Sequence, residues 1–106
     1  MNAVVQAGFR ALADPTRRDI LIMLSDRDMT IAEVAAQFDM TRAAVKKHLS
    51  ILEHGALIDV QSRGRERINR IHPEGFRPVL DWLGFFDGFW DDRLHALKSS
   101  IENKDT

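Results

Sequence analysis

The chain has 106 residues, the length of a single domain (1–106), and 44% of them are hydrophobic, which is enough for a small core. It contains no cysteine, so disulfides, thiolate metal sites and cysteine nucleophiles are excluded, and no apolar run approaches the roughly 20 residues needed to span a bilayer. The net charge of −1 conceals a basic segment, residues 40–77 with eight basic and four acidic residues, between residues 1–39 with four and six and residues 78–106 with three and six.

Two helices are predicted at the start of the chain, over residues 3–13 and 15–25. Apolar residues recur at helical spacing in both, and Asp14-Pro15 offers an N-cap and a suitable first residue for the second helix. The following DRDM is expected to be a loop. The apolar positions that carry the helical pattern are Val5, Phe9, Leu12, Ile20, Leu21 and Leu24.

A helix-turn-helix is predicted over residues 30–54. Thr30-Ile-Ala-Glu33 has the S/T-x-x-E spacing of a capping box ahead of an apolar series, so a short third helix is expected to begin there. Asp39-Met40 is expected to form a tight turn. Thr41 and Gly55 are expected to start and end a fourth helix.

A β-hairpin with an arginine-rich tip is predicted over residues 57–72, which read LIDVQSRGRERINRIH. Apolar residues alternate in its first strand, and a turn containing Gly64 separates the two strands. The alternation in the second strand is imperfect, which leaves room for a bulge. A hairpin that directly follows a helix-turn-helix makes a winged helix. Pro78 must lie in the first turn of a helix, so one long helix is predicted over residues 78–102.

The fourth predicted helix has one face that suits DNA better than packing. Val45, Leu49 and Leu52 share its buried side, whereas small and basic residues occupy the opposite side. In a DNA-binding helix-turn-helix the second helix enters the major groove, where lysine and arginine donate to guanine or phosphate. A solvated charged face, and protection of an exposed strand edge by the hairpin arginines, are the alternatives for each part taken alone. The combination favours binding to double-stranded DNA, by Thr41, Arg42, Ala43, Lys46, Lys47, His48, Ser50, Arg63, Arg65 and Arg67.

His48 has two interpretations that the sequence does not separate. It lies at the edge of the buried stripe of the fourth helix, where it can form a hydrogen bond within the domain. From the same position it can reach a DNA phosphate.

The C-terminal third is rich in aromatic residues. One apolar stripe runs from Val79 to Ile101, and a second stripe of Trp82, Phe85 and Phe89 lies beside it. Because so much exposed aromatic surface is rare in monomers, we expect it to form a homodimer interface, with a small-molecule pocket as the less favoured alternative. The predicted dimer residues are Val5, Phe9, Trp82, Phe86, Phe89, Trp90, Leu94, Leu97 and Ile101.

These motifs together resemble the ArsR/SmtB family of bacterial winged-helix repressors. The resemblance covers about residues 5–100 and rests on ALADPTRRDIL, AEVA, VKKHLSIL and GRERINRI. It implies a mostly α-helical winged helix-turn-helix with about five helices and a wing. It also implies a homodimer that represses transcription from a pseudo-palindromic operator, which can be its own promoter. The C-terminal WLGFFDGFWDDRLHAL resembles a branch without metal sites that includes autorepressors.

The chain lacks metal-ligand residues that part of that family has. The family's cysteine pair in the third helix is missing, and its Asp-x-His and His-x-x-His/Glu pairs are represented only by Asp81 and His95. Their second ligands are replaced by Leu83 and Lys98, so we expect no metal site and no cofactor. Whether a small-molecule inducer exists is left open.

Other classes of function fit the sequence less well. An enzyme is not expected, because there is no phosphate loop, nucleophile–base motif or paired-acid cleft. A winged-helix protein-interaction module is the nearer alternative, although such modules usually lose the basic helix face that this chain keeps. A ligand- or metal-responsive sensor of the same family is a further alternative. The start of the chain lacks the pattern of a signal peptide, so a cytoplasmic location without membrane contact is expected.

Overall fold

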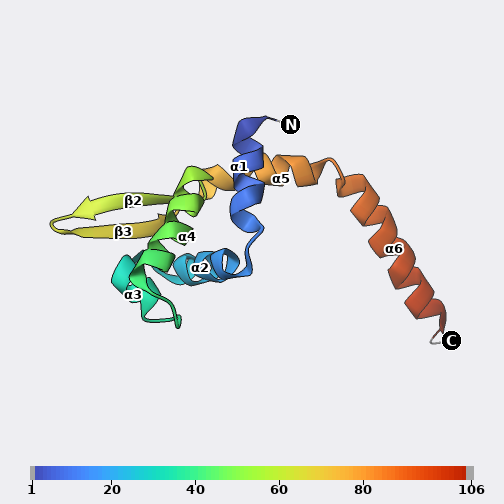
Figure 1. Ribbon diagram of the computed structural model, residues 1–106. Coiled ribbons are helices and arrows are strands. Elements are labelled where there is room, and N and C mark those ends of the chain that lie inside the picture. Colours follow the sequence, from blue (N-terminus) through green and yellow to red (C-terminus); the bar gives the residue numbers. More distant parts are fainter. Residues whose placement is uncertain (1, 105–106) are drawn as a thin grey trace.

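Six α-helices, a short 3-10 helix (η1) and a three-stranded antiparallel sheet occupy residues 2–104, the part of the chain that the computed structural model describes (Figure 1). The fold is the predicted winged helix-turn-helix, mostly α with a small sheet. In chain order the elements are α1 Ala3–Leu12, α2 Pro15–Asp26, β1 Met29–Thr30, α3 Ile31–Ala35, α4 Arg42–His54, β2 Ile58–Arg63, β3 Glu66–Ile71, η1 Pro73–Phe76, α5 Arg77–Gly84 and α6 Asp87–Lys104.

Side chains cap the N-termini of α2 and α3 at the positions that the sequence predicts. Asp14 caps α2 by accepting from the backbone N–H of Arg17 at 3.0 Å. In the capping box of α3, Thr30 Oγ1 accepts from the Glu33 backbone N–H at 3.1 Å, and Glu33 Oε1 accepts from the Thr30 backbone N–H at 3.0 Å. Each bond satisfies a donor that the first turn of a helix leaves free.

The core lies between α2, α3, α4 and the base of the sheet. It includes the predicted buried stripe of α4, where Val45 and Leu52 are fully buried and Leu49 is 4% exposed. This packing sets the direction of α4, because its opposite face must then point to solvent. The other members of the core are Ala11, Ile20, Leu21, Leu24, Met29, Val34, Leu57 and Ile58.

The end of α4 is shaped by close backbone approaches. Gly55 does end the helix, but it keeps a φ of −78°, and Ala56 takes the left-handed φ of 62°. A Cβ on Gly55 would lie 2.9 Å from the carbonyl oxygen of Ala7 in α1, so the glycine is needed for this contact. At the next crossing a Cβ on Gly75 would lie 1.5 Å from the carbonyl oxygen of Ala56, which leaves no room for a side chain.

The sheet contains a strand that the sequence did not predict. DRDM was expected to be a loop, but β1 pairs with β3 through Met29↔Asn69 and Thr30↔Ile68, giving the order β1-β3-β2. The strand has only two residues, too few for an alternating pattern. Buried Asn69 strengthens the pairing, since its side-chain amide donates to the Met29 carbonyl at 3.2 Å.

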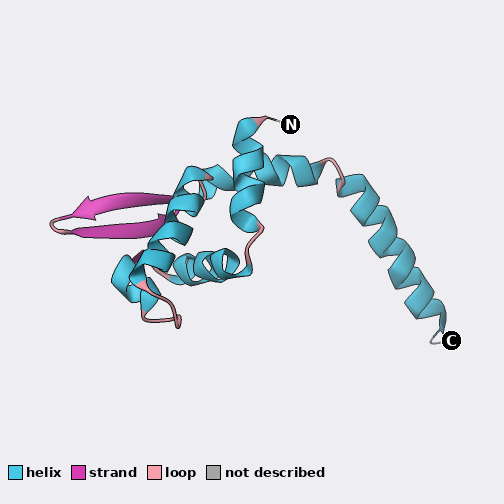
Figure 2. Cartoon of the chain, viewed as in Figure 1, coloured by secondary structure: helices cyan, strands magenta, loops and turns pink. Residues whose placement is uncertain are grey.

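The hairpin of β2 and β3 projects beyond the helices as a wing (Figure 2). Its register runs without interruption from Ile58↔Ile71 to Arg63↔Glu66. The hairpin of β2 and β3 therefore contains no bulge. Gly64 supplies the positive φ of 61° that its two-residue turn requires.

The single long helix predicted over residues 78–102 is divided in two. α5 ends at Gly84, and Phe85 and Phe86 form i→i+3 hydrogen bonds before α6 begins at Asp87. Gly84 and Gly88 flank this break, and glycine is among the weakest helix formers, which explains why the pattern of apolar residues did not keep the helix continuous.

α6 runs away from the other helices and packs substantially against none of them (Figure 1). The Cα radius of gyration is 18.1 Å, whereas a compact chain of this length has about 13 Å. No helix among residues 2–104 has the length and apolar character needed to cross a membrane.

Candidate nucleic-acid interface

The outer face of α4 exposes the side chains that the sequence predicts for DNA contact. Arg42, Lys46 and Lys47 are exposed along it, with the small residues Ala43 and Ser50 on the same side. Thr41 is also exposed, and its hydroxyl already caps the helix by accepting from the Ala44 backbone N–H at 3.1 Å. The face therefore combines donors with small side chains that allow close approach to a base edge.

The wing adds a second row of cations beside this helix. Arg63, Arg65 and Arg67 are all exposed on the hairpin. A groove of about 100 Å³ lies between α4 and the wing, and Lys46, Ser50 and Arg67 line it together with Glu53 and Val60 among others. The fold thus brings Lys46 and Ser50 of α4 and Arg67 of the wing to one groove, which Glu53 also lines.

The cations of this surface are free of ion pairs, whereas those at the base of the wing are not. Within residues 2–104, no salt bridge involves any of the six predicted DNA-contacting lysines and arginines. Arg70, by contrast, binds Asp59 at 2.8 Å, and His72 lies 3.6 Å from the same carboxyl group. Free positive charge is therefore concentrated on α4 and the outer part of the wing, where a polyanion would be attracted.

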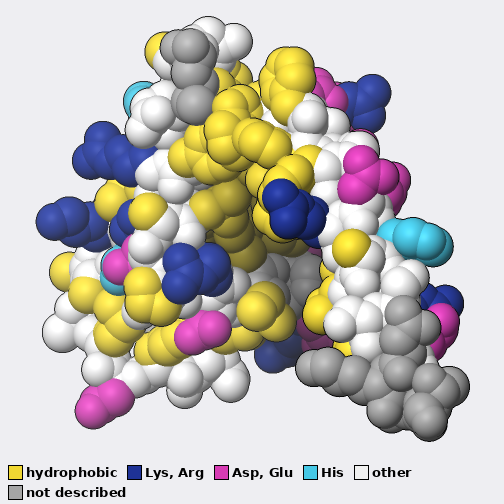
Figure 3. All heavy atoms as spheres, turned by 90° about the vertical axis from the view of Figure 1, so that its right-hand side faces the viewer, with side chains coloured by type: hydrophobic (Ala, Val, Ile, Leu, Met, Phe, Trp, Pro, Cys, Tyr) yellow, Lys and Arg dark blue, Asp and Glu magenta, His cyan; other side chains and the backbone are white. Residues whose placement is uncertain are grey.

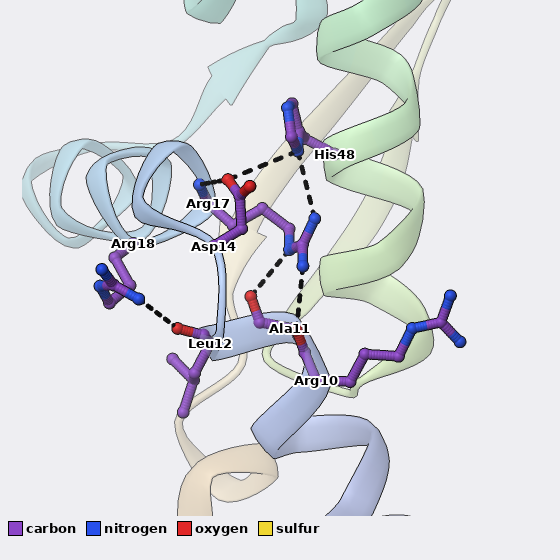
Figure 4. Close-up of polar contacts among 7 residues, drawn as sticks. All are labelled: Arg10, Ala11, Leu12, Asp14, Arg17, Arg18 and His48. Atoms are coloured by element: carbon purple, nitrogen blue, oxygen red, sulfur yellow. Dashed lines mark hydrogen bonds and ion pairs between the residues drawn. The ribbon is translucent and has the colours of Figure 1, made fainter.

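His48 has a partner within the domain that the sequence analysis missed. Its Nδ1 lies 3.4 Å from Arg17 Nη1 and 3.9 Å from Asp14 Oδ2 (Figure 4). Arg17 also donates through Nε to the Ala11 carbonyl at 2.8 Å and through Nη2 to the Arg10 carbonyl at 2.9 Å. Arg17 therefore joins the C-terminal end of α1 to α4, across 31 positions in the sequence, and no short-range pattern signals such a contact.

Asp14 stays ionised beside this contact. The pKa of its carboxyl group lies below the ordinary value, chiefly because the backbone N–H of Arg17 donates to it, with smaller contributions from the charges of Arg17 and His48. Its Oδ2 is already occupied by that backbone donor at 3.0 Å. Arg17 is therefore the nearer polar partner of the imidazole.

The predicted dimer residues do not all lie on the surface. Val5 is only 7% exposed, so it belongs to the packing of its own chain, and Val4 is the exposed valine of α1 at 60%. Phe9 meets Trp82 edge-on at 5.4 Å, and Trp82 contacts Phe86 at 5.1 Å. These aromatic contacts hold α5 against α1.

Beyond Phe86, the remaining predicted dimer residues are uncovered. Leu94, Leu97 and Ile101 on α6 are 62%, 58% and 54% exposed, and Phe89 and Trp90 are 48% and 50% exposed. Hydrophobic side chains surround a hollow on the face of the molecule turned toward this helix (Figure 3). Contiguous exposed apolar surface of this kind marks an interaction site in soluble proteins.

Comparisons with known proteins agree with this geometry. A family model described as a helix-turn-helix domain matches residues 12–61. The uncharacterized HTH-type transcriptional regulator YuzN of Bacillus subtilis is 37% identical over 91 residues, which cover 78% of this chain and 99% of YuzN. A crystal structure of the ArsR family transcriptional regulator RHA00566 superposes with a TM-score of 0.75 at 38% identity, over 83% of this chain and 97% of that chain.

The chain belongs to the ArsR family of helix-turn-helix transcriptional regulators. The chain is also similar to the transcriptional repressor SdpR of Bacillus subtilis, 29% identical over 81% of this chain and 96% of SdpR. As a member of this family, the chain is a DNA-binding transcriptional regulator, and the family consists of regulators rather than enzymes.

Asp81 and Lys98, which the resemblance compares with metal-site positions, each lie near a side chain of opposite charge on the same helix. Asp81 lies 3.8 Å from Arg77, and Lys98 lies 3.9 Å from Glu102, each one helical turn away. Among the described residues, no three histidine, aspartate or glutamate side chains are gathered closely enough to hold a metal ion.

Proposed function

We propose that this ArsR-family regulator is a homodimeric repressor that binds a pseudo-palindromic DNA site, with α4 in the major groove and the wing against the flanking backbone. One observation carries the proposal: α4 and the wing expose an unpaired row of lysine and arginine side chains on one surface. Repression, as opposed to activation, is supported by the likeness to SdpR, a named repressor.

Within this surface the residues have different roles. Arg42, Lys46 and Lys47 lie on the first turns of α4, the part of a recognition helix that reaches base edges and nearby phosphates. Arg65 lies at the tip of the wing, where it can contact phosphate or enter the minor groove. Contacts to base edges give sequence preference, and contacts to phosphate give affinity that depends on salt.

Alanine substitutions separate these roles. Arg65→Ala is expected to weaken binding to all duplexes alike and to reduce the slope of log affinity against log salt by about one unit. Lys46→Ala or Lys47→Ala is expected to change the preference among operator variants by roughly 1–3 kcal/mol if the lysine contacts a base. Fluorescence anisotropy measures both effects, on the duplex upstream of the protein's own gene and on duplexes selected from a random pool.

Lys98→Ala is the matched control, because it removes the same charge from α6, far from the proposed surface. It is expected to leave both affinity and preference unchanged. Wild-type affinity in all three surface variants would contradict the assignment of this face. Transcription from the bound promoter in vitro should fall as the protein is added, and a rise would show an activator.

The homodimer is proposed to cover the apolar face of α6. Leu94, Leu97 and Ile101 are more than half exposed among the described residues, and each large side chain buried contributes roughly 1.5–3 kcal/mol. A second copy offers the same apolar stripe and the same hollow, so a two-fold arrangement can bury the α6 stripes of both copies. Several such residues per chain outweigh the cost of association.

A two-fold dimer would also explain why a DNA site should be pseudo-palindromic. Its two α4 helices would face the same side of the duplex and contact half-sites about 34–36 Å apart, or a larger multiple. Operator affinity should then depend on residues of α6 that touch no DNA.

A further inference from the structure

We propose that Arg17 is a positioning residue for DNA binding, because it holds His48 in the tautomer that presents a donating Nε2–H to the DNA backbone. This inference rests on the proposed contact between α4 and DNA. It assigns a separate role to each ring nitrogen of His48: one binds within the domain and the other binds phosphate.

Arg17 is held firmly enough to orient a second side chain. Two of its three donor nitrogens, Nε and Nη2, donate to the carbonyl oxygens of Ala11 and Arg10 at 2.8 and 2.9 Å, at the end of α1. Both carbonyls belong to the last turn of α1, and that of Arg10 also accepts from the Ala13 backbone N–H at 3.2 Å, so the guanidinium has fixed acceptors on one side. Its remaining Nη1 then points at His48 Nδ1, 3.4 Å away (Figure 4).

The chemistry of the pair determines the tautomer. A guanidinium only donates hydrogen bonds, so Nδ1 of His48 must accept and the ring proton must be on Nε2. A proton on Nδ1 would instead point at a cation and would leave Nη1 without an acceptor. Asp14 Oδ2 would favour that proton, but it is farther away, at 3.9 Å, and is already bonded to the Arg17 backbone.

Both printed contacts of the ring are made by Nδ1, so Nε2 is the ring nitrogen left for a partner outside the Arg17–Asp14 cluster. The His48 side chain is 20% exposed and follows the proposed DNA contact Lys47 in α4, and the proposal places Nε2 at the border of that surface. Arg17 and Asp14, at the start of α2, both approach Nδ1, and the Arg10 side chain of α1 points away (Figure 4). A neutral N–H donating to a phosphate is a charge-assisted bond.

A first experiment reads the tautomer directly. Two-bond ¹⁵N–¹H correlation spectra at pH 8, above the ordinary imidazole pKa of about 6.5, separate a protonated Nε2 from a protonated Nδ1. The wild-type protein should show the proton on Nε2 of His48, both free and bound to DNA. In Arg17→Lys, which keeps the charge but loses the planar fork, the ring should become a mixture of tautomers. A proton on Nδ1 in the wild type would overturn the inference.

A second experiment measures DNA affinity in a double-mutant cycle of His48→Ala and Arg17→Lys. Each single variant should bind a given duplex roughly three- to tenfold more weakly, as expected for one hydrogen bond, and the double variant should bind no more weakly than the worse single variant. His48→Gln, which keeps an N–H donor of similar reach, should restore part of the affinity.

Arg18→Lys is the matched control. Arg18 lies next to Arg17 and donates to a carbonyl of the same helix end, that of Leu12, at 2.7 Å, but no hydrogen bond joins it to His48 (Figure 4). The DNA affinity of Arg18→Lys should stay within twofold of the wild type. This result would show that losing a hydrogen bond to the end of α1 does not by itself weaken DNA binding.

The outcomes distinguish this inference from the proposed function. Additive effects of the two substitutions would show that Arg17 contacts DNA itself, and unchanged affinity of His48→Ala would show that the imidazole contacts none; either result overturns the inference alone. Failure of the wild-type protein to bind any duplex would overturn the proposed function as well.

Discussion

At the scale of single residues, the turn after α4 is the place where the fold tolerates least change. Ala56 takes a positive φ of 62°, and the backbone of η1 passes so close that a Cβ on Gly75 would lie 1.5 Å from the Ala56 carbonyl oxygen. Neither atom belongs to a flexible side chain, so a substitution must move the backbone. This crossing holds the end of α4 relative to η1 and the start of α5.

Gly75→Ala is expected to lower the free energy of unfolding by on the order of 3 kcal/mol or more, because it forces two backbone segments apart. Urea unfolding followed by circular dichroism measures the change. The control is Gly88→Ala in α6, where a Cβ meets no atom within 4 Å. It should be neutral or stabilising by up to about 1 kcal/mol, since alanine is the better helix former. Equal effects of the two changes would contradict this account.

At the scale of elements, α3 depends on its capping box. The pKa of Glu33 lies below the ordinary value, chiefly because the backbone N–H of Thr30 donates to its carboxylate. A hydrogen bond from the Thr30 side chain and the positive charge of Arg27 lower this pKa further. A lowered pKa means that the folded state favours the ionised form. This contribution to stability is complete above the ordinary glutamate pKa and is lost as the pH falls through the lowered value of the folded state.

The variant Glu33→Gln tests this expected loss of stability at low pH. Glutamine can occupy the same capping position but does not titrate. The difference in urea midpoint between wild type and variant should therefore favour the wild type at pH 7 and shrink as the pH falls below about 4. Glu53→Gln, on an exposed part of α4 that caps no helix start, should keep the acid dependence of the wild type. A constant difference between wild type and Glu33→Gln at all pH values would refute the account.

At the scale of the whole molecule, the exposed apolar stripe of α6 allows the proposed homodimer to be tested. Changing Leu97 and Ile101 together to Asp is expected to give monomers with poor operator affinity, although neither residue belongs to the proposed DNA surface. The physical reason is that burying a carboxylate in an apolar interface is far more costly than exposing it. Sedimentation velocity measures the assembly state, and anisotropy on a full operator measures affinity.

Ala96→Asp with Ser99→Asp is the control for that variant. These positions lie on the opposite side of α6 at about 100° per residue and add the same charge. The control should remain dimeric and bind the operator. A Leu97→Asp/Ile101→Asp protein that stays dimeric and binds normally would show that the dimer is built elsewhere, and a monomeric wild type would show that the stripe is covered by a different partner.

The sequence by itself determined the features that depend on neighbours within about four positions along the chain. The caps at Asp14, Thr30 and Thr41 and the buried stripe of Val45, Leu49 and Leu52 each follow from local spacing, and all are present in the structure. The family likeness has the same origin, because it rests on the same short motifs in order. Fold class and DNA-binding function could therefore be predicted without coordinates.

Only the tertiary structure decided the features that join distant parts of the chain. β1 exists because Asn69 meets Met29, 40 positions away, and His48 is oriented because Arg17 reaches it across 31 positions. The burial of Val5 likewise depends on what packs against α1, and not on its place in a helical pattern. Helical spacing says which residues share a face, but it does not say what lies opposite that face. For α6 that question extends beyond the single chain, since its own fold leaves the stripe uncovered.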